Sequence, residues 1–146
     1  MNMIDKDFDF SKIPYTWAMC YLSECSRRDE CLRYQVCMSA GFTLRQCVLP
    51  AVLRKGECPY FHPIRKVRVA IGFKGIFSEV RYRDHSTIRS KIANYLGRGG
   101  TYYRYRNGER ALSPEQQEWI RQLFRRYGYT DEVVFDRYET IYEMKG

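Results

Sequence analysis

The sequence contains no long apolar run and few of the side chains that most enzymes use. Histidine occurs only at His62 and His85, and there is no phosphate-binding loop, nucleophile elbow or helical metalloprotease motif. No apolar stretch approaches the roughly 18 residues that a membrane span requires. The first residues are acidic and polar, whereas a signal peptide is basic and then apolar. These absences predict a cytoplasmic, non-enzymatic protein without a membrane partner.

The chain also lacks internal repeats, low-complexity tracts and flexible linkers. Its 146 residues fit one domain, or two small domains that share a core. Hydrophobic residues make up 45% of the chain and aromatic residues 16%, including 13 tyrosines. This content is sufficient to form a core, so we expect a folded protein.

Positive charge is concentrated in one segment of the chain. Residues 65–110 carry twelve Lys or Arg and three Asp or Glu, an excess of nine positive charges, whereas residues 127–146 carry five acids and two bases. A concentrated basic region is typical of proteins that bind a polyanion, because each neutralised phosphate releases counterions. The segment therefore predicts a nucleic-acid partner, with a solvated basic face as the alternative.

Cysteine is absent after Cys58, although six cysteines lie up to that point. Because no export signal is present, a reducing cytosol favours metal binding or free thiols over disulfides. The segment "CYLSECSRRDEC" has the spacing C-x4-C-x5-C and not the C-x2-C of a zinc knuckle or a redox motif. Cys37 and Cys47 lie in stretches that predict helices, 30–41 and 44–56, where a lone cysteine is commonly a buried hydrophobe.

A tetrahedral thiolate site needs four sulfurs, and three of them are close together in this sequence. These are Cys20, Cys25 and Cys31. We favour Cys58 as the fourth ligand, because "KGECPYF" places it between a flexible glycine and a rigid proline, with His62 as the alternative. Zinc is favoured over an iron–sulfur cluster. The metal would be structural, because a loop-rich segment of this size cannot hold itself together by burial alone.

Local signals in the second half of the chain predict mostly helix. "VRVAI" (67–71) alternates like a short strand, and apolar residues at i, i+3, i+4 and i+7 predict a helix from Gly72 to Arg81. Ser86 is expected to cap a helix that ends at Gly97. Ser113 begins "SPEQ", which is the capping box of a further helix.

The segment "TYYRYRNGERAL" (101–112) fits two structures. In a hairpin, tyrosine and arginine would alternate faces up to a tight turn at Asn107 and Gly108. In the other structure the segment contains a helix, because a helix that ends at Gly97 precedes it and the capped helix at Ser113 follows it.

This second layout resembles the helix-turn-helix of the Cro and C1 repressor-like regulators over residues 73–126. The resemblance rests on "A-x-x-L-G" and "x-x-G-x-R-x-x-P/S", for which we take Ala93, Leu96, Gly97, Gly108, Arg110 and Pro114. It implies a reading helix whose groove-facing residues are Thr101, Tyr102, Arg104 and Tyr105. It places Arg98, Arg106 and Asn107 nearer the nucleic-acid backbone. Tyr103 is expected to point into the core.

Over residues 17–140 the chain also resembles an uncharacterised bacterial family of small proteins with four cysteines. The resemblance rests on "C-x4-C-x5-C-L-R", "C-P-Y-F" and "YYRYRNGE". It supports Cys20, Cys25, Cys31 and Cys58 as metal ligands. It implies no activity, because that family has none assigned.

These observations together predict a mainly α protein. A cysteine-rich, metal-stapled module (1–64) would pack on a basic helix-turn-helix-like domain with an acidic tail (65–146), with at most a short strand or hairpin and possible sharing of one core. The predicted function is nucleic-acid binding, DNA foremost, with a structural metal and without catalysis. The alternative is a protein-interaction adaptor that uses a surface rich in tyrosine and arginine.

Overall fold

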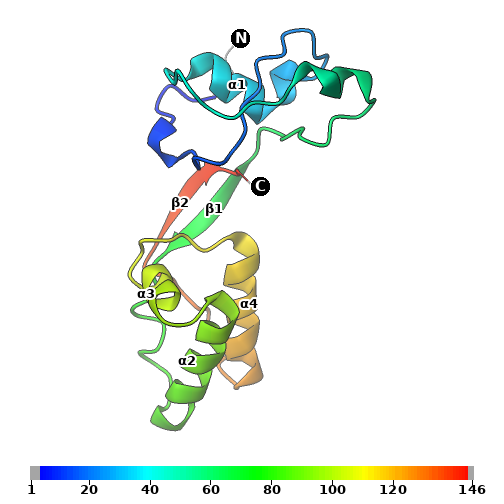
Figure 1. The fold of residues 1–146 in the computed structure, drawn as a ribbon. Helices are drawn as coiled ribbons and strands as arrows, with labels where there is room; N and C mark the ends of the chain where they lie inside the picture. Colours follow the sequence, from blue (N-terminus) through cyan, green and yellow to red (C-terminus); the bar gives the residue numbers. More distant parts are fainter. Residues whose placement is uncertain (1–3, 145–146) are drawn as a thin grey trace. The chain divides into compact units, whose positions relative to one another are not determined.

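The chain folds into two compact units. A computed structural model describes residues 4–144 (Figure 1). The first unit comprises the chain up to Arg65 together with the segment that begins at Tyr142, and the second unit is Lys66–Ile141. The division thus falls one residue later than predicted, and the C-terminal segment joins the first unit.

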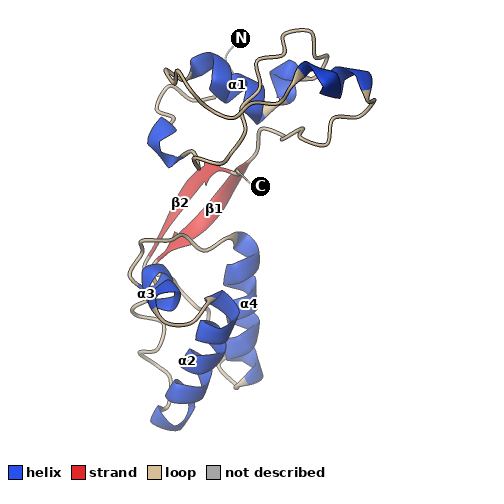
Figure 2. Cartoon of the chain, in the orientation of Figure 1, coloured by secondary structure: helices blue, strands red, loops and turns tan. Residues whose placement is uncertain are grey.

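Helices and strands both build the fold, so the prediction of a mainly α protein is wrong. The α-helices are α1 (Leu32–Ser39), α2 (Tyr82–Leu96), α3 (Gly100–Arg106) and α4 (Pro114–Arg126), and the strands are β1 (Lys66–Ile71) and β2 (Arg137–Tyr142) (Figure 2). Short 3-10 helices cover Phe10–Lys12, Arg28–Glu30 and Pro50–Arg54. The described chain is therefore a small mixed α/β fold. None of its helices has the length and apolarity needed to cross a membrane.

The two strands pair in an antiparallel sheet (Figure 1). β1 confirms the predicted strand, because its alternating valines suit a pleated surface and its last three residues are buried. The sequence does not predict β2, because "RYETIY" carries charged residues. In the structure these residues are at most half-buried. β2 forms by pairing with a strand that is distant in the sequence, and no local pattern encodes that pairing.

Residues 72–81 form turns, so the predicted helix over this segment is wrong. The backbone amides of Lys74 and Gly75 donate to the carboxylate of Asp136 at 2.9 and 3.3 Å. Gly72 has a φ of +81°, which an α-helix does not use. A distant carboxylate therefore anchors this segment in place of helical hydrogen bonds.

α2 begins before the predicted cap. Arg81 is its N-cap residue and Ser86 lies inside the helix, so the predicted capping role of Ser86 is wrong. The hydroxyl of Tyr129 accepts from the Arg81 amide at 3.0 Å and donates to Asp84 at 2.5 Å. This tertiary contact supports a helix start that local sequence does not show. The helix ends at Gly97 as predicted.

α3 follows a turn of three residues, 97–99, and occupies the segment for which two structures were considered. The hairpin alternative is wrong. Gly97 and Gly99 have φ angles of 120° and 66°, which allow the chain to reverse within this short turn. Tyr102 and Tyr105 lie one helical turn apart and are both buried.

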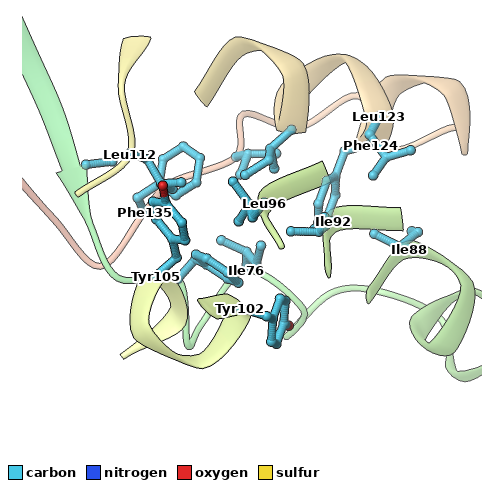
Figure 3. Packing of buried hydrophobic residues seen from close by; sticks show 14 residues of the cluster. Ile76, Ile88, Ile92, Leu96, Tyr102, Tyr105, Leu112, Leu123, Phe124 and Phe135 are labelled. Atoms are coloured by element: carbon cyan, nitrogen blue, oxygen red, sulfur yellow. The ribbon is translucent and has the colours of Figure 1, made fainter. Parts of the chain in front are cut away.

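α4 has the predicted capping box. The Ser113 hydroxyl accepts from the Gln116 amide at 3.2 Å, and the Gln116 side-chain oxygen accepts from the Ser113 amide at 2.9 Å. The buried face of α4 packs with α2 and α3 in one hydrophobic core (Figure 3). Fully buried members of this core include Phe73, Ile88, Ile92, Tyr102, Leu112, Ile120, Leu123 and Phe135.

We expect Ser113→Ala to lower the free energy of unfolding by about 1 kcal/mol, because the Gln116 amide loses its acceptor. Urea denaturation followed by circular dichroism measures this change. Ser86→Ala is the matched control, since Ser86 is exposed inside α2 and alanine is a good helix former. An equal loss of stability in both variants would contradict the assignment of the caps.

In the first unit, the predicted helix over 30–41 is confirmed as α1, whereas the one over 44–56 is wrong. Only Pro50–Arg54 is helical there, and it is a 3-10 helix. The backbone of Cys47 instead forms a parallel bridge with that of Met19. This pairing holds the loop that contains Cys47 in an extended form.

Candidate functional site

Two adjoining hollows lie on the second unit, along α2 and α3. Their volumes are about 210 and 330 Å³, and both are lined by Arg89, Tyr102 and Tyr103. Their other basic lining residues are Lys74, His85, Arg98 and Arg106. Within the described chain, neither hollow is lined by an acidic residue. We call the two hollows together the basic groove.

Two arginines of the basic groove are held by neutral partners. Arg89 donates to the Tyr103 hydroxyl at 2.5 Å, and Arg98 donates to the side-chain oxygen of Asn94 at 2.5 Å. In residues 4–144, no Lys or Arg of the groove forms an ion pair with a carboxylate. Their positive charge is therefore not neutralised by the protein and can act on an anionic ligand.

Tyr102 forms a wall shared by the two hollows. Its side chain is 2% exposed, and its ring packs edge-to-face on Phe73 with 5.5 Å between the centroids. Within residues 4–144 its buried hydroxyl has no hydrogen-bond partner. Burial raises the pKa of this hydroxyl, while the positive charges of Arg89 and Arg106 act in the opposite direction.

A separate cavity lies in the first unit, where four cysteines line one space of about 30 Å³. These are the four predicted metal ligands, Cys20, Cys25, Cys31 and Cys58. The fold therefore brings together the side chains that the spacing singles out, and we call this space the thiol cavity. Among residues 4–144, no three His, Cys, Asp or Glu side chains are positioned to hold one metal ion.

The surroundings of Cys20 disfavour its thiolate. Burial raises the pKa of Cys20, and the negative charge that the other three thiols of the cavity can carry raises it further. All six cysteines of the chain are free. Proximity without a disulfide leaves the four sulfurs available as ligands.

The remaining candidates of the first unit lie outside the thiol cavity. Cys37 packs against a hydrophobic cluster that includes Trp17, and burial raises its pKa. Cys47 lines a different, larger hollow. His62, the alternative fourth ligand, does not line the thiol cavity, and its ring lies edge-on to Trp17 with 5.7 Å between the centroids. Burial lowers the pKa of His62.

The model of one protein family matches residues 3–144, which is nearly the whole chain. It describes a family of unknown function, DUF6078. The chain belongs to the DUF6078 family. No curated protein and no solved structure matches it. The predicted membership of an uncharacterised family is confirmed, and the function has to be inferred from the groove and the cavity.

Three of the predicted nucleic-acid contacts line the basic groove of this DUF6078 chain. They are Arg98, which is exposed, Arg106, which is half-buried, and Tyr102, which is buried. Arg104 and Asn107 are exposed outside the two hollows, and Thr101 is half-buried outside them. The arginines of this segment are thus on the surface, as a phosphate-binding role requires.

Two tyrosines, however, are buried in the core. Tyr102 and Tyr105 are 2% and 7% exposed, so their predicted role as side chains that project into a nucleic-acid groove is wrong (Figure 3). Tyr102 still forms part of the wall of the basic groove, whereas Tyr105 does not. Tyr103, which was expected in the core, is 45% exposed and lines the groove. The reason is helical geometry, because positions i and i+3 share the face that packs on α2.

Sequence reasoning missed three basic residues that the fold adds to the groove. Lys74 comes from the turns after β1, and His85 and Arg89 come from α2. The sequence signal for Lys74 and Arg89 is the excess of Lys and Arg over residues 65–110, which marks the segment but not the individual positions, and His85 is not part of that excess.

Proposed function

We propose that this DUF6078 protein binds nucleic acid, with duplex DNA as the first candidate, through the basic groove and the exposed side of α3. The proposal is carried by one observation. Lys74, Arg89, Arg98 and Arg106 line one groove that no acidic residue lines in the described chain. Such a field concentrates polyanions, and phosphate contacts release counterions on binding.

Each side chain at the groove has a chemical role in this proposal. The arginines bind phosphate oxygens. Tyr103 is exposed and can stack on a base or donate to a phosphate. Arg104 is exposed on α3 and can reach beyond the groove. No catalytic step is part of the proposal.

The connection between the two helices supports DNA as the polyanion. α2 and α3 are joined by the three-residue turn 97–99, as in helix-turn-helix proteins, whose second helix enters the major groove. α3 has only seven residues and two of its tyrosines are in the core, so it offers few side chains to base edges. We therefore expect phosphate contacts to supply most of the affinity and sequence discrimination to be weak.

Fluorescence anisotropy with a labelled 20-base-pair duplex tests the proposal. We expect the dissociation constant to rise steeply with potassium chloride, by a slope of about 0.9 in log–log terms for each phosphate contacted. Single-stranded DNA and RNA of the same length are measured in parallel to identify the preferred polymer. A dissociation constant that does not change between low and physiological salt would contradict phosphate binding.

A charge-matched pair of variants locates the binding surface. Arg89→Gln/Arg98→Gln should reduce the salt slope by about 2 and weaken binding by about tenfold or more at low salt. Arg125→Gln/Arg126→Gln removes the same charge from the end of α4, outside the groove, and should change binding little. Equal weakening by the two double variants would refute the groove as the site. Circular dichroism checks that both variants fold.

The protein-interaction adaptor remains the alternative function. The observation in its favour is the exposure of tyrosine beside arginine, with Tyr82 98% exposed at the start of α2 and Tyr103 45% exposed. Tyrosine and arginine are enriched at the energetic centres of protein interfaces. Absence of binding to all three nucleic acids at low salt would reject the first proposal in favour of this one.

A further inference from the structure

The thiol cavity is built from three separate pieces of the first unit. Cys20 and Cys25 lie in the loop before α1, Cys31 is the N-cap residue of α1, and Cys58 follows the 3-10 helix Pro50–Arg54. Backbone hydrogen bonds tie these pieces together. The Cys20 amide donates to the carbonyl oxygen of Arg33 at 3.4 Å, and the Leu32 amide donates to the carbonyl oxygen of His62 at 2.7 Å. The four sulfurs thus converge because of the fold, and not because of one short motif.

The volume of the thiol cavity bears on whether it binds a single metal ion or a larger group. A closed zinc site holds four sulfurs at about 2.3 Å from one ion, which leaves no room for a water molecule between them. The thiol cavity measures about 30 Å³, and a cavity holds one water at roughly 10–15 Å³. In residues 4–144, moreover, no three potential ligands are positioned around one ion. The described cysteines are thus not gathered around a single-ion position, and the space that they line together with other residues is larger than the interior of a closed zinc site.

We propose that Cys20, Cys25, Cys31 and Cys58 bind an iron–sulfur cluster in the thiol cavity. Such clusters are held by four cysteine thiolates and are larger than a single ion. The C-x4-C spacing of Cys20 and Cys25 also occurs among the ligands of plant-type iron–sulfur clusters. Binding replaces four S–H bonds by four Fe–S bonds, and the four protons pass to solvent.

The charges around the cavity suit an anionic cluster. Four thiolates and the bridging sulfides carry more negative charge than the irons neutralise, and a buried charge requires compensation. Arg27, Arg28 and Arg33 line the cavity, and no Asp or Glu of the described chain does. Arg33 is 4% exposed and is fixed by donating to the carbonyl oxygens of Ala18 at 2.7 Å and Tyr60 at 2.8 Å. Its positive charge therefore stays close to the sulfurs.

Apolar side chains keep water away from the proposed cluster site. Leu22, Val48 and Val52 are buried and form a small hydrophobic group against which Cys20, Cys25 and Cys58 pack. Exclusion of water protects iron–sulfur bonds and influences the reduction potential. The thiol cavity is separate from the basic groove, so this proposal does not depend on nucleic-acid binding.

Metal analysis of the full-length protein tests the proposal. The protein is purified without oxygen, and a second sample is reconstituted with ferrous and ferric iron, sodium sulfide and a thiol reductant. We expect about two or about four irons per chain with equal acid-labile sulfide, together with visible charge-transfer absorption. One zinc per chain without iron would overturn the proposal. Absence of iron from both samples would overturn it as well.

Cysteine variants locate the cluster. Cys25→Ala and Cys58→Ala should each lose most of the bound iron and sulfide, more than about fivefold, because each removes one of four ligands. Cys37→Ala and Cys47→Ala are matched controls, since both cysteines belong to the same unit and lie outside the cavity. Equal loss in controls and ligand variants, or retention of iron in Cys25→Ala and Cys58→Ala, would overturn the assignment. The metal content of the wild-type protein decides the proposal even if a variant does not fold.

Discussion

Phe135→Ala is expected to lower the free energy of unfolding of the second unit by about 3–5 kcal/mol. Phe135 is 2% exposed and belongs to the core formed by α2, α3 and α4. It lies in the segment between α4 and β2, so its ring attaches that segment to the helices (Figure 3). Truncation removes the buried ring and leaves a cavity that neighbouring side chains fill only partly.

The neighbouring residue provides the control for this prediction. Val134 is 63% exposed, and Val134→Ala should change the stability by less than about 0.5 kcal/mol. The chain has two tryptophans, Trp17 in the first unit and Trp119 in the second. Urea denaturation followed by Trp119 fluorescence in a Trp17→Phe background therefore reports on the second unit. A similar effect of the two substitutions would contradict the core position of Phe135.

Gly72→Ala should destabilise the same unit by about 2–4 kcal/mol, for two reasons. First, Gly72 has a φ of +81°, which residues with a Cβ atom rarely adopt. Second, an added Cβ would come within 2.7 Å of a carboxylate oxygen of Asp136. That oxygen accepts from the Lys74 amide, so it cannot move away without breaking the hydrogen bond.

Gly75→Ala is the matched control for Gly72→Ala. A Cβ at Gly75 would lie 3.7 Å from the same carboxylate, which is ordinary contact, and Gly75 does not have a positive φ. We expect a change below about 1 kcal/mol, measured by the same denaturation experiment. A loss in the Gly75 variant that matches the Gly72 variant would show that glycine is needed generally in this turn. Equal stability of Gly72→Ala and the parent protein would refute the strain argument.

The parts of the fold that sequence predicts are those with a local cause. The capping box at Ser113 and the glycine at Gly97 act on backbone groups a few residues away, and both are where the sequence indicates. The parts it misses depend on distant partners. The start of α2 relies on the hydroxyl of Tyr129, and the turns after β1 rely on Asp136. Neither partner can be read from the segment that it stabilises.

The same distinction applies to the candidate sites. The positions of Cys20, Cys25 and Cys31 are close in sequence, and Cys58 joins them through a turn, so spacing predicts a common cavity. The spacing does not predict the volume of the thiol cavity. That volume is what bears on the choice between a zinc ion and an iron–sulfur cluster. In α3, a helix instead of a strand puts Tyr102 and Tyr105 on one face, and the expected pattern of exposed tyrosines changes with it.

The first unit is assembled from both ends of the described chain, with the second unit encoded between them. The Glu143 amide donates to the Arg65 carbonyl oxygen at 2.8 Å, and the Tyr142 hydroxyl accepts from the Asp5 amide at 3.0 Å. During synthesis these contacts can form only after residues 66–141 have left the ribosome. The unit that is translated first is therefore the one whose contacts are completed last, because its C-terminal strand residue and the residues after it are released at the end of synthesis.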